Sequence, residues 1–315
     1  MAEIPVISGE AVRKAVEPAT AVERTRVAFE RHARGEWVMP AKVYLDAPPH
    51  GDFRAMPARG EGFALLKWVT SFPHNSDRGL PVVRGAVLLS DAETGEELAV
   101  IECASVTSLR TGAAAAVSAQ APAAPGSYSV GIVGCGVNGA WAARCLKAAG
   151  FGPGVCSDVR DDPARALADE LGWRTGGREE AVSQDVVVTV TPGEQPVVLA
   201  SDLRPGQHLA VLGADAHGKG EVELDALVNC RLFCDEWEQA SAGGELSGAV
   251  EAGLVQRQDV TNLGEVLIGI AEGRTSVEET TLFDSTGLAI QDLGIVLAVW
   301  DAWRAGLIEA PVSTL

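Results

Sequence analysis

The chain has 315 residues, 47% of them hydrophobic, which is enough for two domains with sizeable cores. Its formal net charge of −18 argues against nucleic acid and anionic membranes as partners, because both repel an acidic surface. No apolar run reaches the roughly 20 residues of a spanning helix, and the amino terminus lacks the basic and apolar regions of a signal peptide. We therefore expect a cytoplasmic protein.

The first third of the chain predicts two helices followed by a mainly antiparallel sheet. Ser8 can cap a short helix that ends near Val16, and Pro18 suits the first turn of a second helix to about residue 34. The loop 91–95 is a candidate hairpin. Strand patterns lie at 42–46, 52–55, 63–71, 82–90 and 97–103.

The remainder alternates strand and helix patterns. An Ala-rich helix is expected over 105–120, and the Pro- and Gly-containing segment 121–126 is expected to be a linker. Further strand patterns lie at 130–133, 155–158, 185–191, 208–212, 232–235 and 281–283. This alternation predicts a doubly wound parallel sheet of the Rossmann type. An apolar helix over 288–305 can return to the first domain.

The expected organisation is therefore α/β with two domains. Residues 1–124, joined by the returning segment 288–315, are expected to form a mainly antiparallel α+β domain. Residues 125–287 are expected to form a dinucleotide-binding Rossmann domain.

A glycine motif marks the start of that second domain. A short strand is followed at once by Gly134, Gly136 and Gly139 in GxGxxG spacing, then by a helix, a second strand and Asp158. Gly134 permits the tight turn, Gly136 lets a pyrophosphate approach the backbone, and Gly139 lets the helix pack on the sheet. Asp158 can accept the ribose hydroxyls, which favours NAD because a carboxylate repels a 2′-phosphate. The alternative is a Gly-rich turn in another βαβ unit.

Basic residues in apolar or small-residue surroundings suggest a second feature. Lys67 lies in mid-strand, where its charge is costly unless an anion compensates it. Arg110, Lys42 and Arg54 have similar surroundings, and each could form a structural ion pair. Together, in an acidic protein, they suggest a carboxylate-binding pocket. Asp215 follows a predicted strand, where sites of open α/β sheets are built, although a helix-capping turn is the alternative.

The six cysteines and five histidines show no metal-ligand spacing. Cys230 and Cys234 are separated by three residues, but no second pair accompanies them. We expect reduced, buried thiols and no metal.

Longer motifs make the chain resemble the ornithine cyclodeaminase/mu-crystallin family, and within it the archaeal-type alanine dehydrogenases. The motifs are Met-Pro-Ala-Lys-Val-Tyr, Gly-Asp-Phe-Arg-Ala-Met-Pro-Ala, Leu-Lys-Trp-Val-Thr-Ser-Phe-Pro, Thr-Ser-Leu-Arg-Thr-Gly-Ala-Ala, the Gly134 loop, Gly-Ala-Asp-Ala-His-Gly-Lys-Gly-Glu-Val-Glu-Leu and Thr-Leu-Phe-Asp-Ser-Thr-Gly-Leu-Ala-Ile-Gln-Asp. They lie between about residues 38 and 303.

The resemblance implies roles for individual residues. Lys67 and Arg110 would bind the substrate carboxylate beside the nicotinamide, and Asp215 would exchange the proton. Lys42 and Arg54 would shape the far end of the pocket. The resemblance also implies a homodimer formed through the first domain. It implies NAD contacts at Val137, Asn138, Asp158, Thr191, Lys219 and Ser285.

The activity implied by the resemblance is NAD(H)-dependent interconversion of a small L-amino acid, such as alanine, and its 2-oxo or imino acid. The family's cyclodeaminases carry a glutamate near the position of Arg54, so Arg54 argues against ornithine cyclisation. The alternatives are an ornithine or lysine cyclodeaminase with recycled NAD, an iminosuccinate reductase that forms aspartate, and a non-catalytic binding protein like mu-crystallin.

Overall fold

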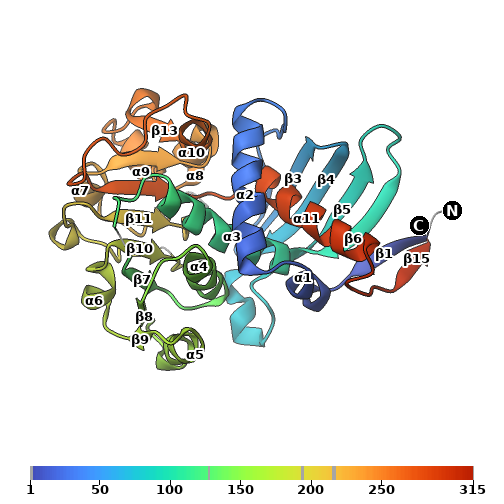
Figure 1. The fold of residues 1–315 in the computed structure, drawn as a ribbon, viewed down its shortest axis with the longest axis horizontal. Helices are drawn as coiled ribbons and strands as arrows, with labels where there is room; N and C mark the ends of the chain where they lie inside the picture. Colours follow the sequence, from blue (N-terminus) through green and yellow to red (C-terminus); the bar gives the residue numbers. More distant parts are fainter. Residues whose placement is uncertain (1–2, 127, 193–194, 215–217, 315) are drawn as a thin grey trace. The chain divides into compact units, whose positions relative to one another are not determined.

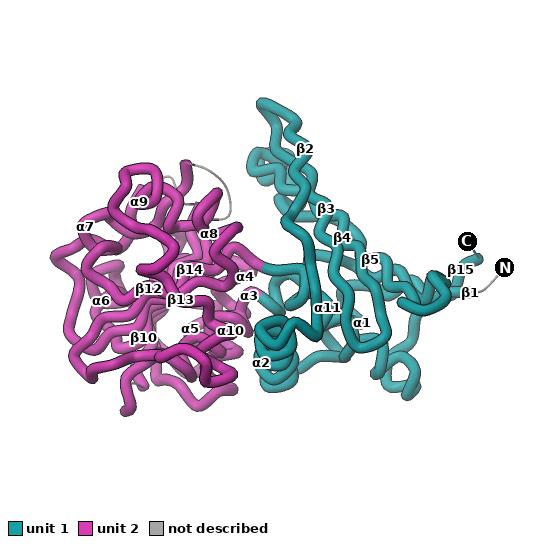
Figure 2. Tube along the Cα trace, turned by 90° about the horizontal axis from the view of Figure 1, so that it is seen from above, with its two compact units in different colours: residues 1–110, 288–315 teal, residues 111–287 magenta. Residues whose placement is uncertain are grey.

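The computed structural model describes residues 3–126, 128–192, 195–214 and 218–314. The chain divides into two compact units, 1–110 with 288–315 and 111–287, which Figure 2 distinguishes by colour. The first division falls inside helix α3 (Cys103–Gln120), whereas the sequence places it in the linker that follows this helix. Helix α3 therefore begins in the first unit and ends in the second.

The first unit contains a mainly antiparallel sheet (Figure 1). In the described part of the chain its strand order is β15-β1-β6-β5-β4-β3-β2, and β1 and β6 form a parallel pair. Its elements are β1 (Glu3–Ile7), α1 (Gly9–Ala15), α2 (Pro18–Ala33), β2 (Val43–Ala47), β3 (Gly51–Gly60), β4 (Phe63–Ser71), η1 (Pro73–Arg78), β5 (Val83–Asp91), β6 (Glu97–Glu102), α11 (Ala289–Arg304) and β15 (Val312–Thr314).

Helix α11 returns to cover one face of this sheet. It packs against α2 and against β3 and β4 (Figure 1). Gly294 permits the close approach to α2, because a Cβ there would lie 2.8 Å from the Arg24 carbonyl oxygen. Alternation along β4 turns Lys67 to the buried face and leaves Trp68 partly exposed on the other. The alternation of side chains along β4 therefore places a lysine in the interior of the unit.

The second unit is built around a parallel sheet. Its elements are β7 (Val130–Val133), α4 (Val137–Ala148), β8 (Gly154–Ser157), α5 (Asp161–Leu171), β9 (Arg174–Thr175), α6 (Arg178–Val182), β10 (Val186–Thr189), η2 (Ala200–Asp202), β11 (His208–Val211), α7 (Leu224–Leu227), β12 (Arg231–Cys234), α8 (Trp237–Gly243), α9 (Ser247–Glu251), η3 (Arg257–Asp259), β13 (Val260–Asn262), α10 (Leu263–Leu267) and β14 (Thr281–Asp284).

The strand order of this sheet identifies where a nucleotide binds in such folds. The order is β13-β12-β14-β11-β10-β7-β8-β9 among the described residues, and all pairs are parallel. The chain proceeds outward from β7 in one direction and from β10 in the other. The direction in which successive strands are added to the sheet therefore reverses between β7 and β10. Ligands of doubly wound sheets bind beyond the carboxyl ends of the strands at such a point.

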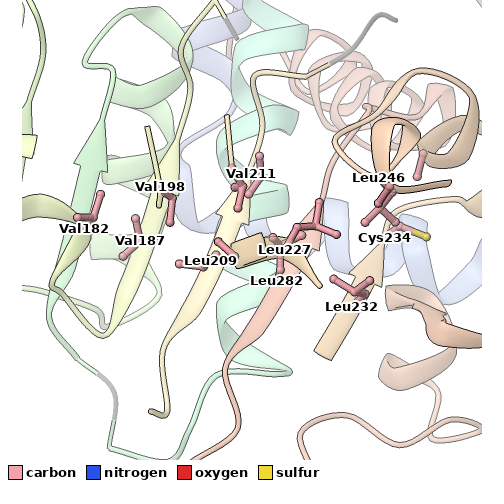
Figure 3. Packing of buried hydrophobic residues seen from close by; sticks show 14 of the residues in the cluster. Val182, Val187, Val198, Leu209, Val211, Leu227, Leu232, Cys234, Leu246 and Leu282 are labelled. Carbon is pink, nitrogen blue, oxygen red and sulfur yellow. The ribbon is translucent and has the colours of Figure 1, made fainter. Parts of the chain in front are cut away.

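Aliphatic side chains from neighbouring strands form the core of the second unit. Val187, Leu209 and Leu282 lie in one row across β10, β11 and β14, and each is at most 1% exposed. Figure 3 shows them within a continuous apolar layer. This packing fixes the strand ends that carry the polar residues described below.

The fold class expected from the sequence is confirmed, and the central strands lie within a few residues of their predicted positions. Ser8 caps α1 by accepting a hydrogen bond from the Ala11 amide at 3.3 Å, and Pro18 occupies the first turn of α2. Strands β1, β9, β13 and β15 were not predicted from the sequence. These strands are short or contain proline, and β1 exists because β6 pairs with it across a long stretch of chain.

Candidate active site

The glycine loop of the second unit has the backbone shape that its spacing predicts. Gly134 follows β7 with φ +96°, and a Cβ there would lie 2.3 Å from the Val190 carbonyl oxygen. A Cβ on Gly139 would lie 1.9 Å from the Gly134 carbonyl oxygen, so this glycine is required for helix packing. A Cβ on Gly136 would meet nothing within 4 Å. The backbone at Gly136 is therefore open to a ligand.

One acidic residue and the first residues of helix α4 lie beside this loop. Asp158 directly follows β8, and its Oδ2 accepts a hydrogen bond from the Cys135 amide at 2.7 Å. Its Oδ1 accepts from the Arg160 amide at 2.9 Å. Val137 and Asn138 begin helix α4, and Val137 is 71% exposed. The carboxylate and the helix amino terminus thus lie at the edge where β7 and β8 end.

A buried carboxylate organises the next two strand ends. Glu221 is fully buried and accepts hydrogen bonds from the Thr191 amide at 2.5 Å, the Thr191 hydroxyl at 2.7 Å and the Gly213 amide at 2.7 Å. Glu245 in turn accepts from the Glu221 amide at 2.9 Å. Burial raises the pKa of Glu221 and raises that of Glu245 to about 7. These acids hold Thr191 and Gly213 in position.

Ser285 and Lys219 complete the set that the resemblance assigns to the cofactor. Ser285 follows β14, is 4% exposed, and lies with its hydroxyl 3.5 Å from Asp235 Oδ2. Asp235 also accepts a hydrogen bond from the Gly287 amide at 2.7 Å. Lys219 is half-buried, two residues before Glu221. Thr191, Ser285 and Asp158 all come directly or within two residues after a parallel strand.

In the first unit, two of the predicted cations converge on one acid. Lys67 is 1% exposed and donates a hydrogen bond from Nζ to Asp292 Oδ1 at 2.9 Å. Arg110 Nε lies 3.4 Å from the same oxygen. Asp292 is fully buried near the amino terminus of α11. Within the described residues, Asp292 Oδ2 and Arg110 Nε have no hydrogen-bond partner. Two cations and one carboxylate leave this buried group one positive charge in excess.

The other two predicted cations belong to the same unit, and Arg54 lies on the same sheet face as Lys67. Arg54 on β3 is 7% exposed, and Asp52 pairs with it through two contacts, Nε to Oδ1 at 2.5 Å and Nη2 to Oδ2 at 3.1 Å. Its guanidinium carbon lies 5.3 Å from the centre of the Tyr44 ring. Lys42 is half-buried just before β2.

Comparison with known proteins assigns the chain to a family. Residues 6–306 match the profile of the ornithine cyclodeaminase/mu-crystallin family. The chain belongs to the ornithine cyclodeaminase/mu-crystallin family. The family expected from the motifs is thereby confirmed.

Three relatives of this family resemble the chain over nearly its whole length. An alanine dehydrogenase of Archaeoglobus fulgidus is 39% identical over 306 residues, covering 95% of each protein. A solved archaeal alanine dehydrogenase dimer with bound NAD is 37% identical, with 100% of both chains covered and a TM-score of 0.94. The iminosuccinate reductase of Paracoccus denitrificans, solved in complex with NAD+, is 26% identical, with 100% of both chains covered and a TM-score of 0.90.

Asp292, Glu221 and Glu245 were not predicted from the sequence as parts of the site. Asp292 ends the motif that begins at Thr281, but its role becomes visible only when α11 is seen to pack on β4. A lysine in an apolar strand does signal a buried anion, although not which one. Asp215, predicted to exchange the proton, lies outside the described residues.

The cysteines are free, and all but the partly buried Cys230 are buried. Cys135 in the glycine loop interacts with Cys156 on β8, and their hydrogen bond raises the pKa of the Cys135 thiol. Across the ranges that the structure describes, no group of three or more His, Cys, Asp and Glu side chains is arranged to hold a metal ion. None of the described helices has the length and apolar character needed to cross a membrane.

Proposed function

We propose that this chain is an NAD(H)-dependent amino acid dehydrogenase that interconverts a small L-amino acid and its 2-oxo or imino acid. Alanine and pyruvate are the default pair. The observation that carries the proposal is the buried group of Lys67, Arg110 and Asp292, because its single excess positive charge matches one substrate carboxylate. The similarity to an alanine dehydrogenase over 95% of the chain supports the same activity.

The second unit is suited to NAD(H). The open backbone at Gly136 fits a pyrophosphate, the first turn of α4 supplies amide groups, and Asp158 fits the ribose hydroxyls. Two similar proteins were solved with NAD bound. When bound, NAD(H) supplies or accepts the hydride at C2 of the substrate. Val137, Asn138, Thr191, Lys219 and Ser285 are the further residues that we assign to its binding.

The first unit is suited to the substrate. Lys67 and Arg110 bind the carboxylate and withdraw electron density from C2, which favours addition of a hydride there. Asp292 keeps the two cations in place. Asp215 is assigned the proton exchange at the substrate nitrogen, because its position in the family motif implies that role. Lys42 and Arg54 are assigned to the end of the substrate that carries the side chain.

The alternatives are less well supported by the residues of this chain. A cyclodeaminase must hold the side-chain amine of ornithine or lysine, and this chain has Arg54 near the position where the family's cyclodeaminases carry a glutamate. A binding protein without activity has no need of a proton-exchanging acid, and the chain retains Asp215 at that position of the family motif. These observations favour the dehydrogenase over both.

We also propose a homodimer formed through the first unit. The sheet face opposite α11 exposes large apolar side chains: Val43 at 63%, Leu45 at 58%, Leu66 at 42% and Trp68 at 43%. A patch of this kind marks an interaction surface, and an archaeal alanine dehydrogenase of the same fold was solved as a dimer. The free cysteines support a reducing, cytoplasmic location.

A substrate panel tests the proposed activity. Purified protein is mixed with NADH, ammonium and one of several 2-oxo acids, and the loss of NADH absorbance is followed. We expect loss with pyruvate that depends on ammonium. Release of ammonia from L-ornithine with no net change in NADH would establish a cyclodeaminase instead. No NADH loss with any 2-oxo acid would contradict the dehydrogenase.

A further inference from the structure

The pairing of Arg54 with Asp52 bears on which substrates this site accepts. Asp52 occupies the Nε and Nη2 side of the guanidinium at 2.5 and 3.1 Å. The Arg54 side chain is 9% exposed and that of Asp52 is 19% exposed. This geometry is the two-contact recognition that arginine offers a carboxylate. The protein itself therefore provides the carboxylate on that side of Arg54.

Arg54 lies on the same face of the sheet as Lys67. In the β3–β4 register, Arg54 is opposite Val69 and Met56 is opposite Lys67. Residues two apart on a strand share a face, so Arg54 and Lys67 are diagonal neighbours, with about 7–8 Å between their Cα atoms. Both side chains are on the face that α11 covers. Arg54 is therefore close enough to meet the far end of a short substrate whose carboxylate is at Lys67.

A second carboxylate on the substrate would meet an unfavourable environment at this point. It would have to displace Asp52 from Arg54, and Asp52 is held two residues away on the same strand. Placed beside the pair without displacing it, the second carboxylate would face the negative charge of Asp52. Juxtaposed like charges oppose binding of the wrong partner. A methyl or other small neutral group meets neither difficulty.

We propose that Asp52 is a specificity-determining residue that excludes dicarboxylic substrates by occupying Arg54. The site then prefers amino acids with short neutral side chains, and the corresponding 2-oxo acids, over aspartate and oxaloacetate. This inference rests on the proposed function, because it takes Arg54 to be part of the substrate site.

The test compares Asp52→Asn with the wild type. Initial rates of NADH loss are measured with ammonium and either pyruvate, 2-oxobutyrate or oxaloacetate. In the wild type we expect kcat/KM for 2-oxobutyrate to exceed that for oxaloacetate by about tenfold or more. In Asp52→Asn we expect this ratio to fall by about tenfold, mainly through a lower KM for oxaloacetate, because the carboxamide leaves Arg54 its charge. Asp46→Asn is the matched control, since Asp46 is exposed and lies opposite Asp52 in the β2–β3 register.

Several results would overturn the inference. They are a wild-type preference for oxaloacetate, an unchanged ratio in Asp52→Asn, and an equal change in Asp46→Asn. If Asp52→Asn does not fold, inhibition of the wild type decides: propionate should inhibit more strongly than succinate, and the reverse order would refute the role of Asp52. The proposed function fails separately, when the wild type consumes no NADH with any 2-oxo acid.

Discussion

Lys67 on β4 donates a hydrogen bond to Asp292 on α11 across 2.9 Å, although 225 positions separate the two residues in the chain. The contact is fully buried and joins the amino-terminal part of the chain to the helix that returns to it near the carboxyl terminus. Arg110, at the boundary of the first unit, shares the same acid. One aspartate therefore compensates both cations that we assign to the substrate carboxylate.

Replacing Asp292 is expected to affect stability as well as activity. Asp292→Asn leaves Lys67 buried without a counter-charge, and loss of one partner of a buried ion pair costs about 3–5 kcal/mol. Denaturant unfolding measures this loss. The double variant Lys67→Met/Asp292→Leu should recover part of it, because both charges are removed, while NADH consumption remains lost. If the double variant loses as much stability as the single variants Lys67→Met and Asp292→Leu lose together, the pair is not coupled.

The glycines of the loop provide a matched pair for the cofactor site. Gly136→Ala places a methyl group in open space, so the free energy of unfolding should change by no more than about 1 kcal/mol. The same methyl group would stand where the pyrophosphate approaches, so the Kd for NADH, measured by fluorescence titration, should rise about tenfold or more.

The control for that variant is Gly139→Ala. Its methyl group would lie 1.9 Å from the Gly134 carbonyl oxygen, so this variant should lose stability before it loses affinity. Unchanged NADH affinity in Gly136→Ala would remove the loop from the cofactor site.

The parts of this protein that the sequence predicted are those set by local pattern. Gly134 and Gly139 stand where the backbone leaves no room for a Cβ, and the alternation of residues around Lys67 identifies a strand. Pairing between residues that are far apart in the chain is harder to predict from the sequence. That Lys67 needs an anion follows from its burial, but the choice of Asp292 depends on how α11 packs.

The same distinction applies to Asp52 and to β1. The Asp52–Arg54 pair joins residues two apart, yet only the strand geometry establishes that the carboxylate turns to the guanidinium. Strand β1 contains a proline and pairs with β6, so its own residues gave no strand signal.

Glu245 predicts a pH dependence of stability. Its pKa is about 7 in the folded protein and 4.5 when unperturbed, so the unfolded chain binds fewer protons between these values. The contribution of Glu245 to the free energy of unfolding is fully present below about pH 4.5. It is lost as pH rises through about 7, by an amount on the order of 3 kcal/mol. Glu245→Gln stays neutral, so its stability relative to the wild type should increase from pH 5 to pH 8 in urea unfolding. A constant difference would refute this, and exposed Glu238→Gln is the control.

The dimer surface is tested by adding charge to the exposed sheet face. Leu45→Lys/Leu66→Lys places two ammonium groups on the apolar patch, and their desolvation opposes association. Light scattering should give twice the chain mass of 32.7 kDa for the wild type and a single chain mass for the variant. Leu307→Lys, at a residue 67% exposed after α11, should remain dimeric. A wild type that is monomeric would remove the proposed dimer.

Transfer of a labelled hydride from NADH to C2 of the substrate is the defining step of the proposed dehydrogenase. The protein is supplied with NADH deuterated at the transferred position, ammonium and pyruvate, and the product is analysed by mass spectrometry. We predict alanine that carries one deuterium at C2, formed in a one-to-one ratio with the NADH consumed, and no such product from Lys67→Met. Absence of labelled alanine from the folded, NADH-binding wild type, together with ammonia release from ornithine at constant NADH, would show that the protein is a cyclodeaminase and not a dehydrogenase.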